Sequence, residues 1–270
     1  MNTENAPQTL DALEARAWLD VYKAAPAEYA ARAGLDLVET PDGIGLALRD
    51  VPTGLLNRFR LTADPAPISA ASVQRALAWL GRHANAVQVI DAIAPPGSGA
   101  HGLIEAAGLP LAGRLAKFWR GTAPLPPTTD CSLTIREAGP AEGMDFARVA
   151  QVSFGMPDSL LGWFSALPGR PNWRIYVAYD GAAPAATGAM HVTGDTAWLG
   201  WGATVPEFRN RGGQNALLAR RLQDGMAAGV RLFTIETGQP ADGEPPGGSS
   251  RNIERAGFVF SHTRHSFKRG

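Results

Sequence analysis

The chain has 270 residues, 45% of them hydrophobic and 19% charged, which is enough length and apolar content for one large or two ordinary folded domains. Lys and Arg together number 25, as do Asp and Glu, so the formal net charge at pH 7 is zero. A balanced charge argues against a nucleic acid or an anionic membrane as partner, because such partners select a basic surplus.

The single cysteine, Cys131, excludes an intramolecular disulfide and is too little for a thiolate metal site. The N-terminal residues are polar and lack the order of a signal peptide, and no run of about 18 apolar residues predicts a membrane span. We therefore expect a cytoplasmic protein with no metal and no membrane partner.

The first half of the chain predicts alternating helices and strands. Helical spacing covers residues 10–33, 69–83 and 101–107, whereas strands are expected over 35–39, 44–48, 55–61, 87–93 and 111–119. This alternation is typical of an α/β protein.

A proline-rich segment, residues 122–130, separates the two halves. Its prolines lack backbone donors and favour an extended chain, as linkers do. The sequence therefore predicts one domain over residues 1–121, a linker over 122–130 and a second domain over 131–270.

The second half predicts a similar alternation. Strands are expected over 133–136, 173–179, 188–193, 197–205, 232–236 and 258–267, and helices over 141–154, 159–167 and 250–256, with a longer helix after Gly213 that ends before Gly229. The pair Gly194-Asp195 suits a tight turn between two of these strands.

A short internal match links the two halves. Residues 103–109, Leu-Ile-Glu-Ala-Ala-Gly-Leu, resemble residues 252–258, Asn-Ile-Glu-Arg-Ala-Gly-Phe. Each segment lies between a Pro/Gly/Ser-rich loop and a final strand. Together with the similar order of elements, this match predicts an internal repeat.

The most informative segment is a basic, glycine-bearing loop between a strand and a helix. Arg209 and Arg211 precede Gly212 and Gly213, and the helix follows directly. Backbone N–H groups at a helix start bind anions, glycine lets the backbone approach a phosphate, and arginine supplies charge. The loop is neither a P-loop nor a dinucleotide fingerprint, and a Gly-Gly turn with two solvated arginines remains an alternative.

Arg209-x-x-Gly212 before a long helix resembles the acyl-CoA pyrophosphate loop of the GNAT superfamily of N-acetyltransferases, whose pattern is Gln/Arg-x-x-Gly-x-Gly/Ala. Gln214 departs from that pattern at its sixth position. Residues 251–258 resemble the helix-then-Gly-Phe ending of the superfamily, and the order of elements over 131–267 agrees. The first half shares only the order of elements and resembles a degenerate repeat.

The resemblance implies an α/β fold of two GNAT-like domains, each a mixed, mostly antiparallel twisted sheet flanked by helices. It implies acetyl-CoA as the cosubstrate. The strand before the loop would diverge from its neighbour, and its backbone N–H groups would bind the pantetheine arm and thioester oxygen, whereas the helix start would hold the pyrophosphate. The residues so implied are Ala203, Thr204 and Val205 on the strand, then Arg209, Arg211, Gly212, Gly213, Gln214, Asn215 and Ala216, with Asn252 and Arg255 from the last helix.

The acid that protonates the leaving thiolate is not evident from the sequence. Many members of the superfamily use a tyrosine of the last helix, and Ile253 takes its position here. Ser250 or Asn252 is expected to place a water instead or to hydrogen-bond the CoA arm, although Asn252 suits a local capping role equally well. The thiolate can also take a proton from solvent.

Two residues are candidates for the base that accepts the proton of the amine. Glu236 is the first, because it lies near the end of the strand beside the cofactor strand, and His191 is the second. A salt bridge of Glu236 with Arg231 or Arg251 and a structural role of His191 stay open as alternatives.

Three functions are open. The first is an N-acetyltransferase that moves an acetyl group from acetyl-CoA to a primary amine of a small molecule or peptide by direct attack in a ternary complex. The second is a non-catalytic acyl-CoA-binding or scaffold protein, and the third is a two-module acyltransferase like mycothiol synthase. Asp64, Pro65 and Pro67 follow the strand of the first half in place of a phosphate loop, so that half is expected to be structural or to shape the acceptor site. A monomer or a homodimer is compatible with a tandem repeat.

Overall fold

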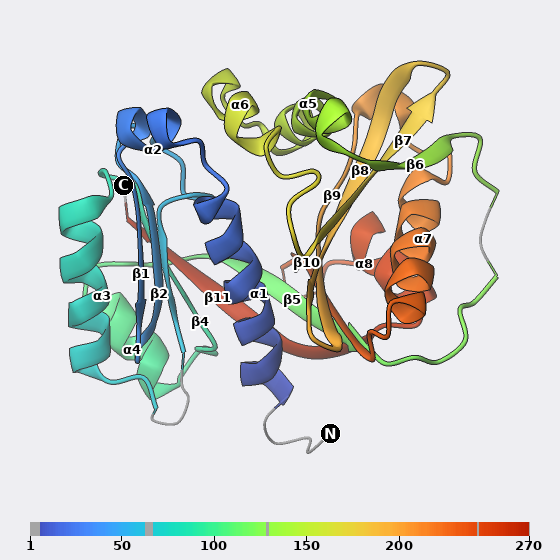
Figure 1. Cartoon of the computed structure of the whole chain (residues 1–270). Coiled ribbons are helices and arrows are strands. Elements are labelled where there is room, and N and C mark those ends of the chain that lie inside the picture. Colours follow the sequence, from blue (N-terminus) through green and yellow to red (C-terminus); the bar gives the residue numbers. More distant parts are fainter. Residues whose placement is uncertain (1–5, 63–66, 128–129, 242, 270) are drawn as a thin grey trace. The chain divides into compact units, whose positions relative to one another are not determined.

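The computed structural model describes residues 6–62, 67–127, 130–241 and 243–269 (Figure 1). The chain divides into two compact units. Unit 1 comprises the chain up to Lys117 together with residues 237–247 and 261–270, and unit 2 comprises residues 118–236 and 248–260.

The boundaries of the units differ from the predicted domains, 1–121 and 131–270. The end of the chain belongs to unit 1, because residues 265–269 pair in antiparallel with residues 88–92. A strand pattern in the sequence does not name its partner, so this return of the chain could not be predicted. The predicted linker, 122–130, lies in unit 2, and its residues 128–129 fall outside the described residues.

Unit 1 combines helices with a mixed sheet. Its strands follow the order β1-β2-β3-β4-β11-β5, in which β3 and β4 are parallel and the pairs β1-β2, β2-β3 and β4-β11 are antiparallel. The elements are α1 (Ala6–Lys23), α2 (Ala27–Ala33), β1 (Leu35–Thr40), β2 (Gly43–Leu48), β3 (Arg58–Leu61), α3 (Ala70–His83), β4 (Gln88–Ala92), α4 (Gly99–Ala106) and parts of β5 (Leu111–Arg120) and β11 (Val259–Arg269).

One face of the unit 1 sheet forms an apolar core with α3. This helix begins at a capping box made by Ser69 and Ser72, which satisfies the amides of its first turn. Its Trp79 packs with Phe59 of β3 and occupies the space that a Cβ on Gly45 would need, at 2.6 Å. Glycine at position 45 therefore lets the helix approach the sheet closely.

Unit 2 has the same kind of mixed sheet. From the end of β5 its order is β5-β10-β9-β8-β7-β6, with β9 and β10 parallel and the pairs β6-β7, β7-β8 and β8-β9 antiparallel. The elements are β6 (Thr134–Ala138), α5 (Gly143–Phe154), α6 (Leu161–Phe164), β7 (Trp173–Asp180), β8 (Ala183–Thr193), β9 (Thr196–Thr204), α7 (Gly213–Ala227), most of β10 (Leu232–Gly238) and α8 (Gly248–Arg255).

Different helices cover the two faces of the unit 2 sheet (Figure 1). On one face α7 packs so closely that a Cβ on its Gly225 would lie 2.5 Å from the ring of Phe233. On the other face α5 and α6 bring Phe154 and Phe164 against Trp201 of β9. Side chains that alternate along β9 and β10 therefore face either α7 or the pair α5 and α6.

In the first half of the chain, two predicted elements differ clearly from those observed. The helix predicted over 10–33 is two helices, because Pro26 precedes α2 and cannot continue α1. The strand predicted over 55–61 begins only at Arg58. The side chain of Asn57 accepts from the N–H of Leu48 at 2.8 Å and donates to the carbonyl of Val51 at 2.8 Å, which holds the preceding residues in turns.

Candidate active site

The glycine-bearing loop opens into α7. Gly212 is the N-cap residue of this helix and has a φ of 75°, which favours glycine. A Cβ on Gly212 would lie 2.2 Å from the carbonyl oxygen of Asp130, and one on Gly213 would lie 3.0 Å from Leu133. The segment that leads into β6 therefore requires a glycine at position 212, independently of any phosphate at the helix start, whereas at position 213 only the end of the Leu133 side chain would have to move.

The two arginines of the loop differ in what they contact. Arg211 binds Asp180 through both Nη atoms, at 2.8 and 2.9 Å, and its Nε donates to Ser132 at 3.0 Å. The Arg211 guanidinium holds the pKa of the Asp180 carboxyl below its ordinary value. Arg209 is exposed and forms no ion pair within the described residues, so it is the loop cation that is available to an anion.

Gln214 ties the start of α7 to the sheet. Its Nε2 donates to the carbonyls of Ala203 and Thr187, at 2.6 and 3.2 Å. The side-chain amide at the position where the sequence departs from the superfamily pattern thus joins α7 to β8 and to the end of β9. The N–H of Ala216 donates to the carbonyl of Gly212 at 3.1 Å and closes the first helical turn. The N–H of Ala216 is thus used within the helix. Of the residues predicted to bind the pyrophosphate at the helix start, only those before Ala216 can offer their N–H groups to an anion.

β9 and β10 part beside this loop. Their parallel pairing runs from Thr196 and Leu232 to Leu199 and Ile235. Both strands continue past that point, β9 through residues 200–204 and β10 through residues 236–238. Since β9 remains paired with β8 over this stretch, its other edge leaves the ladder with β10 there.

A β-bulge lies where the strands part. Trp201 and Gly202 of β9 stand opposite the single Gly188 of β8, and Trp201 has a φ of 52°. An aromatic residue rarely adopts this backbone region, and such strain concentrates at functional sites. The bulge turns Trp201 onto the face covered by α5 and α6, where its ring centroid lies 5.6 Å from that of Phe154 and 4.8 Å from that of Phe164.

The predicted strand residues are not equivalent. The N–H of Val205 donates to the carbonyl of Ala185 on β8 at 3.0 Å, so this amide is already used within the sheet. Amide directions alternate along a strand, which turns the N–H of Thr204 away from β8. Thr204 is therefore better placed than Val205 to present its amide to a ligand beside β9.

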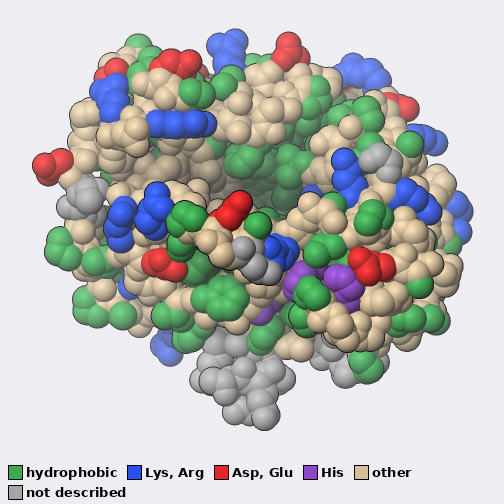
Figure 2. All heavy atoms as spheres, turned by 180° about the vertical axis from the view of Figure 1, so that it is seen from behind, with side chains coloured by type: hydrophobic (Ala, Val, Ile, Leu, Met, Phe, Trp, Pro, Cys, Tyr) green, Lys and Arg blue, Asp and Glu red, His purple; other side chains and the backbone are tan. Residues whose placement is uncertain are grey.

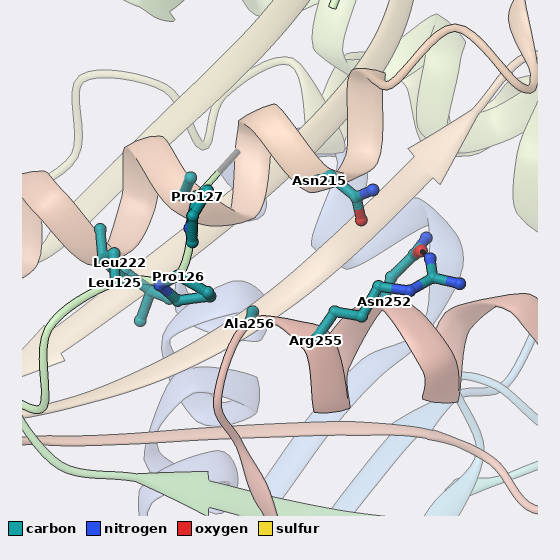
Figure 3. Close-up of a pocket in the computed structure, with 9 residues that line it drawn as sticks. Leu125, Pro126, Pro127, Asn215, Leu222, Asn252, Arg255 and Ala256 are labelled. Atoms are coloured by element: carbon teal, nitrogen blue, oxygen red, sulfur yellow. Dashed lines mark hydrogen bonds between the residues drawn. The ribbon is translucent and has the colours of Figure 1, made fainter. Parts of the chain in front are cut away.

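A groove lies between α7 and α8 (Figure 3). Asn215 from the first turn of α7 and Asn252 and Arg255 from α8 extend toward one another across it, and Arg255 donates to the side-chain oxygen of Asn252 at 3.2 Å. The structure thus brings together three of the predicted cofactor residues. The other lining residues are Leu125, Pro126, Pro127, Ala219, Leu222 and Ala256.

The candidate bases share the face of the sheet that α5 and α6 cover. Thr234 pairs with Trp198, and Glu236 follows two residues later on the same face, as the first residue of β10 beyond its pairing with β9. Glu236 is partly buried. His191 pairs with Trp198 and is 95% enclosed, with its ring 4.9 Å from that of Trp173. Glu236 lies level with the bulge, whereas His191 lies deeper in the aromatic core.

The last helix places its residues as an amphipathic helix does. Ser250 and Ile253 are buried on its inner side, and Asn252 and Arg255 line the groove. Ile253 therefore occupies an apolar site, and the hydroxyl of Ser250 lies among buried residues.

Sequence reasoning missed several of these features. Asp180 and Ser132 are far from the loop in sequence, so no local signal connects them to Arg211. The bulge had a signal, because glycines on both sides of Trp201 inside a strand are typical of a bulge. No signal in the sequence indicated that Leu125 and the two prolines after it line the groove.

Unit 1 also contains a parallel strand pair, but buried charged side chains pack against its sheet. β3 and β4 pair in parallel, as β9 and β10 do. Residues 63–66, where a phosphate loop would follow β3, fall outside the described residues. On the face covered by α1, buried charges form a network: Glu14 contacts Arg60, Lys117 and Arg264, Asp91 contacts Arg58 and Ser266, and Asp11 contacts His262.

The face seen in Figure 2 shows no dominance of one charge. Basic and acidic side chains are interspersed on the face seen in Figure 2, as the balanced composition predicts. In the described part of the chain, every helix is too short or too polar to cross a membrane.

Solved structures share this fold. A GCN5-related N-acetyltransferase from Kribbella flavida is 16% identical, with 90% of this chain and 93% of that chain covered and a TM-score of 0.63. One from Sphaerobacter thermophilus is 18% identical over 78% of this chain and 72% of that chain, with a TM-score of 0.61. A tandem GNAT protein from the clavulanic acid biosynthesis pathway is 17% identical over 100% of this chain and 95% of that chain, with a TM-score of 0.56.

No protein-family model matches the chain, and no curated protein matches it. At these identities the solved structures show the fold and leave the activity to be argued from the site. The chain has the fold of the GNAT acetyltransferases in a tandem arrangement. The predicted resemblance and the predicted α/β fold of two GNAT-like domains are confirmed.

Proposed function

We propose that the chain is an acetyltransferase that moves an acetyl group from acetyl-CoA to a primary amine of a small molecule or peptide, with its one active site in unit 2. The observation that carries this proposal is the parting of β9 from β10 beside a glycine-bearing loop that opens into α7. A strand edge released from its ladder and a helix start together suit a ligand with an extended arm and a diphosphate.

In this proposal each part of the cosubstrate contacts a different element around the loop. The diphosphate meets the amides of Gly213 and Gln214 at the start of α7, with charge from Arg209. The pantetheine arm follows the released edge of β9, where Thr204 turns its amide away from β8. Asn215 and the two α8 residues of the groove bind the polar atoms that remain on the nucleotide side.

The reaction then takes place at the bulge. The neutral amine attacks the thioester carbonyl, a C–N bond forms, and the C–S bond breaks. Glu236 accepts the proton that the amine loses, directly or through a water. Because Ile253 stands in place of an acid, the leaving thiolate takes its proton from solvent. Backbone amides at the bulge stabilise the oxygen on which negative charge develops.

The acceptor enters from the face that carries Glu236. Trp201 and Phe154 flank this side of the bulge, and Phe154 keeps 42% of its surface exposed. Aromatic edges beside a carboxylate suit an amine with an apolar or aromatic body. Net charge gives no reason to expect a nucleic acid there.

A thiol-release assay tests the proposal. The chain is incubated with acetyl-CoA and, separately, with spermidine, tyramine, an aminoglycoside and a lysine peptide, and free CoA is measured. Release that depends on an amine and falls on Glu236→Gln supports the proposal. Tight binding of acetyl-CoA without release of free CoA for any amine favours the non-catalytic acyl-CoA-binding alternative. The isoleucine at position 253, where an acid is expected, is compatible with that alternative.

A further inference from the structure

Arg221 is a buried arginine beneath the bulge. It lies on the inner side of α7, in line with Leu217 and Gly225, and only 2% of its surface is exposed. Its Nη1 donates to the carbonyl of Ala189 on β8 at 3.1 Å and to that of Gly200 on β9 at 3.4 Å, and its Nε donates to Leu217 one turn earlier at 3.1 Å. The guanidinium therefore joins both strands at the point where β9 bulges.

The bulge and the guanidinium fit one another. A Cβ on Gly188, the residue opposite the bulge, would lie 2.7 Å from Cζ of Arg221. Glycine at position 188 thus leaves the space that the guanidinium fills. A Cβ on Gly202, in the bulge itself, would lie 3.9 Å from Nη2.

Stability alone does not explain a positive charge at this buried position. Within the described residues its hydrogen bonds go to carbonyls, and no carboxylate forms an ion pair with it. Burial lowers the pKa of Arg221 to about 10, which reflects the cost of removing this charge from water. A methionine or leucine would fill such a core site without that cost. Exceptions of this kind to core patterning are typical of functional sites.

Through the contact with Gly200, Arg221 can affect a backbone N–H of the bulge, because the two groups belong to one peptide bond. The carbonyl of Gly200 and the N–H of Trp201 belong to the same planar group, and in a trans peptide they point in opposite directions. A cation on the carbonyl draws electron density through the group and makes the N–H a stronger donor. The N–H of Trp201 points away from Arg221.

We infer that Arg221 is a positioning residue for acetyl transfer: its guanidinium holds the bulge of β9 and polarises the Gly200–Trp201 peptide, so that the amides of the bulge bind the thioester oxygen more strongly. This inference rests on the proposed function of unit 2. The charge that stabilises the developing oxyanion thus comes from a residue on the far side of β9, and this residue does not touch the substrate.

Infrared difference spectroscopy with acetyl-CoA carrying ¹³C at the thioester carbonyl tests the inference without an acceptor. A polarised carbonyl absorbs at lower frequency than that of free acetyl-CoA. We expect a downshift on the wild-type protein, loss of most of it in Arg221→Met, and an intermediate value in Arg221→Lys, which keeps the charge. Gly188→Ala, which displaces the guanidinium from the opposite strand, should also lose it. Turnover in Arg221→Met should fall about tenfold, less than when an oxyanion donor itself is removed.

Arg220→Met is the matched control, because this neighbouring arginine of α7 pairs with Asp224 at the surface and should leave the band unchanged. Calorimetry with acetyl-CoA shows in each variant that the thioester is bound. A full downshift in folded Arg221→Met overturns the inference, and if that variant does not fold, a full downshift in both Arg221→Lys and Gly188→Ala does the same. A wild-type protein that does not bind acetyl-CoA would instead remove the proposed function, and the inference with it.

Discussion

Arg211 and Asp180 form a two-pronged ion pair, with Nη1 2.8 Å from Oδ2 and Nη2 2.9 Å from Oδ1. The pair joins the loop before α7 to the end of β7. An arginine that is committed to a carboxylate has less to offer a phosphate than one that is not. The sequence gives no reason to prefer either loop arginine as the phosphate ligand, whereas the structure favours Arg209 over Arg211.

We expect Arg209→Ala to weaken acetyl-CoA binding about tenfold, which is about 1.4 kcal/mol. Arg211→Ala should weaken it less, because Asp180 already satisfies that guanidinium. Isothermal titration calorimetry at low salt measures both. Asp180→Asn provides the matched test, since it releases Arg211 and should tighten binding. A larger loss in Arg211→Ala than in Arg209→Ala would show that the ion pair opens when the cosubstrate binds.

Glu236→Gln should lower turnover at least about tenfold, or 1.4 kcal/mol in barrier, and leave acetyl-CoA affinity nearly unchanged. The amine arrives protonated at neutral pH, and the amide of glutamine cannot accept its proton. The loss should shrink as the pH approaches the pKa of the amine. Steady-state kinetics across pH checks this. Normal turnover near pH 7 would place the base elsewhere, with His191 the next residue to test.

Glu14→Gln should destabilise unit 1 by about 3–5 kcal/mol, because it leaves Arg60, Lys117 and Arg264 without their shared carboxylate in a buried site. Urea unfolding followed by tryptophan fluorescence measures the change. Glu39→Gln is the control, since the side chain of Glu39 is 61% exposed and, among the residues that the structure describes, pairs only with Lys23, at 3.6 Å. Equal effects of the two substitutions would contradict a buried ionic role for Glu14.

The stability of unit 1 should also fall in acid. Burial alone would raise the pKa of Asp91, but Arg58, Arg264 and Arg60, with a hydrogen bond from Ser266, hold it below its ordinary value. A carboxyl with a lower pKa in the folded state contributes stability that is complete above about pH 4 and is lost as the pH falls further. The free energy of unfolding of wild type should therefore drop below pH 4. In Asp91→Asn, which is less stable at pH 7, that drop should be smaller.

The local features of the site could be predicted from the sequence. A glycine at φ 75° and a helix directly after it leave a pattern within a few residues, and the alternation along β9 and β10 placed Glu236 at the end of its strand. These signals work because short-range sterics and periodicity set them.

The remaining features depend on contacts between distant residues. The partner of β11 in unit 1, the carboxylate that holds Arg211, and the use of Gln214 on β8 and β9 have no local signature. Arg221 is the clearest case, because an arginine among leucines on a helix is expected to extend to solvent. Its burial depends on the space left by Gly188 and on carbonyls of β8 and β9, which lie far from it in the sequence.

Unit 2 is expected to hold a single acetyl-CoA site, which runs from the released edge of β9 past the start of α7 and has its nucleotide side in the groove between α7 and α8. Calorimetric titration of the whole chain with acetyl-CoA tests it most directly, with Asn252→Trp to fill the groove and Glu105→Trp, at an exposed position of unit 1, as the control. We predict one site per chain in the wild type and in the control, and loss of binding in Asn252→Trp. Two sites of similar affinity, or unchanged binding in folded Asn252→Trp, would contradict the account.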